Sequence, residues 1–315
     1  MSDAERPVDL GRRLRRARRR ALFLGLRTVL RVAGFQRVGL LGQLTGALQY
    51  RLAWRQCRRI AHDMALALGR PPGDPSVAPL LREAYRVNNT AVLEILAMFD
   101  QRQDEDALIA RCEVDGLAHL RAAMAGGRGA ILLATHMGNA ALLTVKLARA
   151  GWGVSVVYRE ARMMSAGLLQ NGLEQYGIEG ILANTGLRAY AQMVSALKQG
   201  RIVFVMMDQG VQQAETGLMQ RFLGKDAAMP AGPAQLARAA RAPLLPVATI
   251  AAEPVWRFEI QPPVALGQGP LDADVERLVQ ITEQQIRRHP QLWSWHHRRW
   301  RKLRPATTPA PTASS

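Results

Sequence analysis

GAILLATHMGN, residues 129–139, is the stretch of sequence that indicates the fold. Its first seven residues, Gly129 to Thr135, form a short apolar run that begins at a glycine, as buried strands often do. A stretch with helical character, Ala140 to Ala150, follows directly. His136 is therefore expected at the carboxyl end of a strand, which is where open α/β sheets place their ligands.

Comparable apolar runs recur along the chain and alternate with helical stretches. Further strands are predicted at Val154–Tyr158, Ile202–Met207, Leu244–Ile250 and Phe258–Gln261, and further helices at 51–67, 80–99, Leu117–Ala125, Leu187–Gln199, Ala231–Ala240 and Ala273–Arg288. The alternation predicts an α/β fold with a mixed, largely parallel central sheet and helices on both faces.

The charge balance is strongly basic, with 42 Lys and Arg against 25 acidic residues and a formal net charge of +17. A field of this sign attracts nucleic acid, anionic lipid or an acidic carrier protein. No stretch of 18 or more residues is free of charge, so an ordinary membrane-spanning helix is not expected. Cys57 and Cys112 lack CxxC spacing, so neither a metal site nor a disulfide framework is expected.

The N-terminal region is the most basic part of the chain. Seven arginines precede an apolar run at 21–26: Arg12, Arg13, Arg15, Arg16, Arg18, Arg19 and Arg20. In a helix, Leu22, Phe23, Leu26, Val29 and Leu30 share one side, a pattern typical of an amphipathic helix at a membrane surface. The alternatives are a solvated basic tail followed by an ordinary docking helix, or an arm that binds nucleic acid. No basic groove with interleaved aromatics occurs elsewhere, so nucleic acid is not an expected partner.

His136 is the candidate catalytic residue. A histidine at a strand end can take a proton from an alcohol and so make the alcohol oxygen a better nucleophile toward a thioester. A packed or capping histidine is the alternative, and for an isolated histidine it would be preferred. The neighbouring motifs reverse that preference.

Five segments in order resemble the bacterial lipid A biosynthesis (lauroyl/myristoyl) acyltransferase family. Residues 135–139 resemble its His-x-Gly-Asn signature, 158–159 its Tyr-Arg, and 197–209 (LKQGRIVFVMMDQ) its helix-Gly-strand-Asp-Gln segment. Residues 221–224 resemble Phe-Phe-Gly, and 286–300 (IRRHPQLWSWHHRRW) resemble the closing Pro-x-x-Trp-x-Trp-x-His-Arg-Arg-Trp, the most specific of the five. The resemblance covers about residues 110–304.

The resemblance implies a glycerolipid-acyltransferase-like fold and a reaction. The reaction is transfer of a fatty acyl group from acyl carrier protein, or from coenzyme A, to a hydroxyl of a lipid A precursor or related glycolipid, at the cytoplasmic face of the inner membrane. No metal or redox cofactor is expected. The expected partners are acyl carrier protein, anionic membrane lipid and the glycolipid acceptor. The expected organisation is a membrane-associating segment at 1–50, an acyltransferase-like domain at 51–304 and a disordered tail at 305–315.

Beside His136, the resemblance and the strand ends suggest substrate-binding residues: Asn139, Arg159, Asp208, Gln209, Arg221 and Gly224. Arg159 suits phosphate oxygens, although it could instead pair with Glu160 or Asp208. Asp208 and Gln209 follow an apolar strand, where structural support is the alternative role. A tight turn would account for Gly224 without any ligand.

The closing motif combines aromatic and basic side chains. Trp293 and Trp295 are predicted to pack in the core. The cations Arg298, Arg299, Arg301 and Lys302 are predicted to face anions. His296 and His297 are adjacent, so their rings point apart and a zinc site is not expected there.

One departure from the family pattern concerns catalysis directly. The family pairs its histidine with an Asp or Glu after four intervening residues, and here that position is Ala141. Loss of such an acid would leave the enzyme very slow or inactive. Three explanations are open. Another carboxylate, from Glu160, Asp208 or Glu215, approaches His136; the chain is a catalytically inactive protein that binds lipid or a partner; or the alanines were introduced deliberately.

Overall fold

The computed structural model describes residues 24–159, 167–209 and 217–296. Its helices are α2 (Phe35–Leu52), α3 (Trp54–Ala67), α4 (Val77–Asp100), α5 (Glu105–Ala110), α6 (Leu117–Met124), α7 (Ala140–Arg149), α8 (Leu168–Glu174), α9 (Leu187–Lys198), α10 (Gly232–Ala240) and α11 (Leu271–Arg288). Residues 24–33 are also helical, and short 3-10 turns lie at Ala183–Thr185 and Pro290–Leu292.

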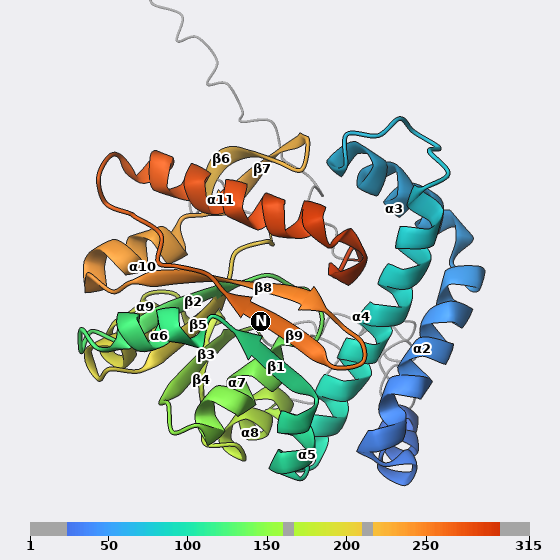
Figure 1. Ribbon diagram of the computed structural model, residues 1–315, viewed down its shortest axis with the longest axis horizontal. Helices are drawn as coiled ribbons and strands as arrows, with labels where there is room; N and C mark the ends of the chain where they lie inside the picture. The colour runs from blue at the N-terminus through green and yellow to red at the C-terminus, as the bar shows by residue number, and fades with distance from the viewer. Residues whose placement is uncertain (1–23, 160–166, 210–216, 297–315) are drawn as a thin grey trace, which may run out of the picture.

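Seven strands form the central sheet, in the order β1-β9-β8-β2-β5-β3-β4. These are β1 (Cys112–Asp115), β2 (Ala130–Ala134), β3 (Val154–Tyr158), β4 (Glu179–Leu182), β5 (Ile202–Met206), β8 (Leu244–Ala251) and β9 (Trp256–Ile260). Only β8 and β9 pair antiparallel. Figure 1 shows α10 and α11 on the opposite side of the sheet from α7 and α8. The predicted α/β fold with a mixed, largely parallel sheet is confirmed.

The central strand β2 explains why this sequence folds as it does. All five of its residues are buried, because helices cover both faces of the sheet at this position. On either side it pairs in parallel with β5 and β8, whose apolar runs are also buried. The five apolar runs predicted as strands correspond to β9, β8, β2, β5 and β3. These are the inner strands of the sheet, and β1 and β4 are its edges.

A two-stranded hairpin, β6 (Gly217–Phe222) and β7 (Lys225–Pro230), lies outside the sheet and contacts α11. The predictions did not include it, nor β1, β4, α2, α5 and α8. The helix predicted at 51–67 begins later, at Trp54. The boundary expected at residue 50 falls inside α2, which packs on α4 through its buried residues Val38, Gly42 and Gly46.

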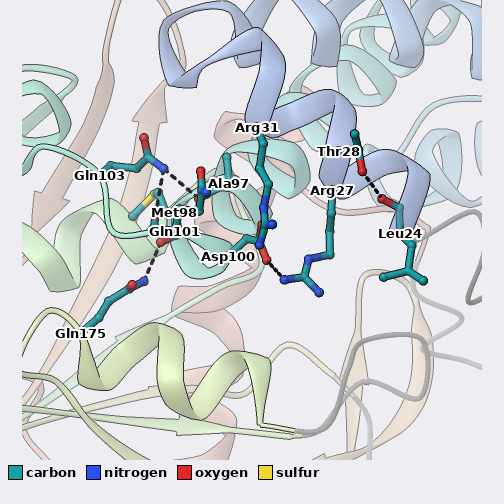
Figure 2. A network of polar contacts seen from close by, with 10 residues as sticks. All are labelled: Leu24, Arg27, Thr28, Arg31, Ala97, Met98, Asp100, Gln101, Gln103 and Gln175. Carbon is teal, nitrogen blue, oxygen red and sulfur yellow. Dashed lines mark hydrogen bonds and ion pairs between the residues drawn. The ribbon is translucent and has the colours of Figure 1, made fainter.

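The helical stretch 24–33 docks onto the end of α4. Leu30 is buried and Leu26 packs beside it, in a cluster with Leu93 and Leu96. Figure 2 shows Arg27 and Arg31 converging on Asp100, the last residue of α4; the distance from Arg31 Nε to Asp100 Oδ2 is 2.6 Å. Part of the expected membrane-facing side is thus used for internal packing. Leu22, Phe23 and the seven upstream arginines lie outside the described residues.

Candidate active site

The register of two neighbouring strands brings His136 and Asp208 together. Strands β2 and β5 run in parallel, and Ala134 at the end of β2 is paired with Met206 at the end of β5. His136 lies two residues beyond Ala134, and Asp208 lies two residues beyond Met206. The two side chains therefore stand at the same level on the same edge of the sheet. Parallel strands end at one edge, and this edge is where α/β sheets place reactive groups.

Asp208 holds the imidazole of His136 through direct hydrogen bonds. Its Oδ1 lies 2.7 Å from His136 Nδ1, and its Oδ2 accepts from the His136 main-chain N–H at 3.1 Å. The indole Nε1 of Trp293 donates to the same Oδ2 at 2.8 Å. A carboxylate accepts hydrogen bonds, so Nδ1 carries the ring proton and Nε2 presents its lone pair outward. This is the tautomer that a general base requires.

Gln209 lies at the outward nitrogen of the ring. Its side-chain Nε2 is 3.0 Å from His136 Nε2, so the amide N–H donates to the imidazole lone pair. His136 is partly accessible, with 31% of its side chain exposed, whereas Asp208 is fully buried. An alcohol that gives its proton to His136 must take the place of the Gln209 amide.

An apolar cavity of about 380 Å³ opens beside His136. It lies between α4 and the sheet and is lined by side chains of α4, α7, β3, α8 and β5, among them Ala91, Ile95, Phe99, Leu169, Val156 and Phe204. Its polar lining residues include His136, Ser294 and His296. The arrangement places a base at the rim of a space suited to a hydrocarbon chain.

The position of the missing acid forms part of this cavity. Ala141 lies in the first turn of α7 and lines the apolar wall. The carboxylate that contacts His136 is instead that of Asp208, two residues beyond the end of β5, and it is one of the three proposed from the sequence. The other two candidates, Glu160 and Glu215, lie outside the described residues.

Asn139 is buried behind the site. It ends the segment before α7, and its Nδ2 donates to Glu94 Oε2 of α4 at 3.0 Å. Glu94 also accepts from Trp256 Nε1 at 2.7 Å and pairs with Arg111 at 2.6 Å. Glu94 was not among the site residues predicted from the sequence. The only signal was a lone acidic residue among the apolar positions of a predicted helix.

The segment that follows α11 completes the site. Main-chain N–H groups of Gly138 and Ser294 donate to Leu292 O at 3.1 Å and to His136 O at 2.9 Å. Gly138 has φ +61°, and a Cβ there would collide with the Trp256 ring, so glycine is required. Residues 136–138 are thereby fixed between β9 and the chain at 292–294.

The remaining predicted site residues lie elsewhere. Arg159 is exposed at the end of β3. Arg221 is exposed on the hairpin, 3.8 Å from Asp226, and neither Arg159 nor Arg221 lines the cavity. Gly224 has φ +82° in the hairpin turn, which is the structural role considered above. Trp293 and Trp295 are buried as predicted, while His297 and the four cations of the closing motif lie outside the described residues.

Comparison with known proteins gives the family. The profile of the bacterial lipid A biosynthesis acyltransferases matches residues 12–302. The chain belongs to this family. Phosphatidylinositol mannoside acyltransferase from Mycobacterium tuberculosis strain H37Rv is 27% identical over 256 residues, which cover 77% of this chain and 76% of the relative. The protein of the same name from Mycolicibacterium smegmatis is 25% identical over 77% of this chain and 79% of its own length.

The resemblance drawn from five motifs is thereby confirmed, and so is the expected class of enzyme, an acyltransferase. In this acyltransferase, three of the motifs meet at one place. Phe222 of the hairpin packs edge-on against Trp293 at 6.1 Å between ring centroids, and Trp293 donates to Asp208. Distant family motifs therefore converge on the acid that orients His136.

The described residues contain no cluster of three or more His, Cys, Asp or Glu side chains that could hold a metal ion. Within the same residues, no helix has the length and apolar character needed to cross a bilayer.

Proposed function

We propose that this protein transfers a fatty acyl group from a thioester donor to a hydroxyl of a membrane glycolipid, with His136 as the general base. The observation that supports this most strongly is the hydrogen bond of 2.7 Å between His136 Nδ1 and Asp208 at the rim of an apolar cavity. Asp208, just beyond the end of the neighbouring strand β5, supplies the acid that is absent at Ala141.

The chemistry follows from the tautomer. His136 Nε2 takes the proton of the acceptor hydroxyl while the hydroxyl oxygen attacks the thioester carbonyl carbon. The buried carboxylate of Asp208 stabilises the imidazolium that forms. The tetrahedral intermediate collapses with cleavage of the carbon–sulfur bond, and the departing sulfur takes the proton from His136. An ester and a free thiol result, and His136 is neutral again.

The cavity and the charge support the choice of substrates. The cavity is lined mainly by aliphatic and aromatic side chains, which suits the acyl chain. The net charge of +17 favours an acidic acyl carrier protein as donor over neutral carriers, with coenzyme A as the alternative. The relatives are named for phosphatidylinositol mannoside and the family for lipid A, so a sugar hydroxyl of a glycolipid is the proposed acceptor. The proposed location is the cytoplasmic face of the inner membrane.

The test uses the full chain with labelled acyl carrier protein or labelled acyl coenzyme A. A lipid A precursor or a phosphatidylinositol mannoside is supplied in detergent micelles as acceptor. Ester formation is expected with wild type and should fall to background with His136→Ala. His119→Ala is the matched control, since His119 is exposed on α6 and does not line the cavity.

Equal turnover by wild type and His136→Ala would contradict the proposal. Absence of turnover with every donor and acceptor, together with binding of acyl chains in the cavity, would favour the rival function of a catalytically inactive lipid-binding protein. The two acceptors separately report which sugar the enzyme acylates.

A further inference from the structure

The outer face of α2 is a leucine stripe. Leu40, Leu44, Leu48 and Leu52 recur every four residues and are 60%, 59%, 55% and 71% exposed. The opposite side of the helix is buried against α4, which Figure 1 shows between α2 and the sheet. Four large apolar side chains in a row on the exterior are unusual for a soluble surface and indicate a binding face.

Arginines flank this stripe, and α2 itself contains no acidic residue. The nearest acid at its border is Glu253, which accepts a hydrogen bond from Gln43 beside Leu40. No Asp or Glu occurs from Leu10 to His62 in the sequence. Arg37 and Arg51 are exposed at the two ends of α2, and Arg55 lies over the half-exposed ring of Trp54 at 5.1 Å. Arg58 and Arg59 are exposed on the following helix. Leucines bordered by arginines and a tryptophan match the boundary between the head groups and the acyl chains of an anionic bilayer.

The preceding helical stretch, residues 24–33, exposes Leu24, Val29 and Val32, but its other apolar and basic side chains are used inside the fold. Leu26 and Leu30 pack into the fold, and Arg27 and Arg31 pair with Asp100 (Figure 2). The stripe on α2 has no such internal partner among the described residues, since its leucines stay more than half exposed.

We infer that α2 is the membrane-docking face of the protein: it lies in the plane of an anionic bilayer, with the leucine stripe inserted and the arginines at the lipid phosphates. This inference rests on the proposed function only in that the acceptor is a membrane lipid. A second copy of this chain fits the face poorly, because a symmetric contact would bring like-charged arginine clusters together.

The test measures co-sedimentation of the full chain with vesicles made of equal parts phosphatidylcholine and phosphatidylglycerol. Leu44→Gln/Leu48→Gln should lower the vesicle partition coefficient by about tenfold or more. The matched control is Leu187→Gln/Met219→Gln, two apolar residues 88% and 54% exposed on α9 and β6, which should leave partition unchanged. Circular dichroism verifies that both variants fold.

A second variant tests the charge. Arg51→Gln/Arg55→Gln/Arg59→Gln should lower partition into the phosphatidylglycerol vesicles, and its remaining binding should depend less on salt. With vesicles of pure phosphatidylcholine, the partition coefficient of this variant should be close to that of wild type.

Partition of the leucine variant equal to wild type would overturn the inference. So would loss of a dimer in analytical ultracentrifugation with vesicle binding unchanged, because the stripe would then join two copies. The binding measurement needs no thioester, and His136→Ala should bind like wild type. The vesicle-binding result can therefore be interpreted even if the proposed reaction is not observed. The activity assay can likewise be interpreted if vesicle binding does not change.

Discussion

The carboxylate of Asp208 uses both oxygens at once. Oδ1 contacts the imidazole Nδ1, and Oδ2 accepts from the His136 main chain and from Trp293. Since each hydrogen bond comes from a rigid or buried group, the acid has little freedom to turn away from the ring. The single carboxylate thus fixes both the tautomer and the direction of His136.

Asp208→Asn should lower kcat for acyl transfer by about 10⁴, because the amide no longer enforces the productive tautomer or stabilises the imidazolium. Steady-state kinetics with the labelled thioester would show this, with thermal unfolding to verify the fold. Asp226→Asn, on the exposed hairpin, is the control and should retain wild-type kcat. A loss smaller than tenfold in Asp208→Asn would mean that another group orients His136.

Ala141→Glu restores the acid of the family pattern, yet turnover should not rise. The histidine already has its carboxylate, and a glutamate at this position would place a charge in the wall of an apolar cavity. We expect kcat/KM to fall, measured against Ala141→Gln, which has the same size without the charge. An increase of about tenfold or more would show that Asp208 does not serve as the acid.

The sequence identified Asp208 as one candidate for the acid beside His136, but it could not distinguish Asp208 from the other candidates. Strand ends are visible in sequence, so Glu160, Asp208 and Glu215 were equivalent candidates. Which strand lies next to β2 depends on the order of the sheet, and this order is set by crossover packing rather than by local pattern. The one sequence signal of Glu94 was an acidic residue among the apolar positions of a predicted helix, and it named no partner because the partners are far apart along the chain.

At the scale of elements, the inner strands were predictable and the outer ones were not. Strands β2 and β5 are continuous apolar runs, as expected of strands covered on both faces, and β3 and β8 depart from such a run only at Ser155 and Thr249. The edge strands β1 (CEVD) and β4 (EGIL) are short and carry acidic residues, so they have no such run. Helix α2 was missed because its outward face is apolar, which obscures the amphipathic pattern.

The C-terminal half of helix α4 forms one wall of the cavity. Its lining residues extend from Asn88 to Phe99, which corresponds to about 16 Å of helix. The Asn88 end is near His296, which contacts Tyr85 one turn before, and at the other end Phe99 packs on Gly172 of α8. Phe99 therefore closes the cavity at the end away from His296.

Phe99→Leu should shift the preference of the enzyme toward longer acyl donors, by about tenfold in relative kcat/KM between neighbouring chain lengths. The smaller side chain leaves space for additional methylene groups. Competition among acyl carrier thioesters of graded length would measure this. The control is Phe258→Leu, which changes a fully buried residue of β9 that does not line the cavity and should keep the wild-type chain-length preference. The same chain-length preference in both variants would contradict the idea that Phe99 limits the length of the acyl chain.

Docking of residues 24–33 should depend on pH through Asp100. Burial acts to raise the pKa of Asp100, but the hydrogen bonds from Arg31 and Arg27 outweigh it and hold the pKa below its usual value. A carboxyl with a lowered folded pKa stabilises above its unfolded pKa of about 3.9, and this contribution is lost as pH falls through the folded value.

Hydrogen exchange in residues 24–33 should therefore accelerate in acid below about pH 4, relative to the rest of the chain. Asp100→Asn should show the faster exchange already at neutral pH. The control is Asp106→Asn, whose side chain is 83% exposed. Unchanged protection in Asp100→Asn would show that Leu26 and Leu30 suffice for docking.

Across the whole molecule, Glu94 joins parts that are distant in sequence. From α4 it contacts Arg111 before β1, Asn139 before α7 and Trp256 of β9. It is almost completely buried, so its charge depends on these partners. The same carboxylate therefore connects the helical layer to the sheet and to the catalytic motif.

Glu94→Ala should lower the free energy of unfolding by about 3–5 kcal/mol, because it leaves a buried indole, a buried amide and the partly buried guanidinium of Arg111 without their acceptor. Urea denaturation followed by circular dichroism would measure this. Glu83→Ala, on the same helix but 39% exposed, should change stability by less than about 0.5 kcal/mol. Similar losses in both variants would mean that the network adds no stability.

The return of residues 292–294 to the His136 segment has a consequence for biosynthesis. The indole that secures the acid and the backbone that borders Gly138 both come from the end of the described chain. A ribosome that has translated as far as Gln209 has already produced His136 and Asp208. It has not yet produced residues 292–294, which fix the positions of these two side chains. The nascent polypeptide is therefore without a finished reaction centre until residues 292–294 have been synthesised.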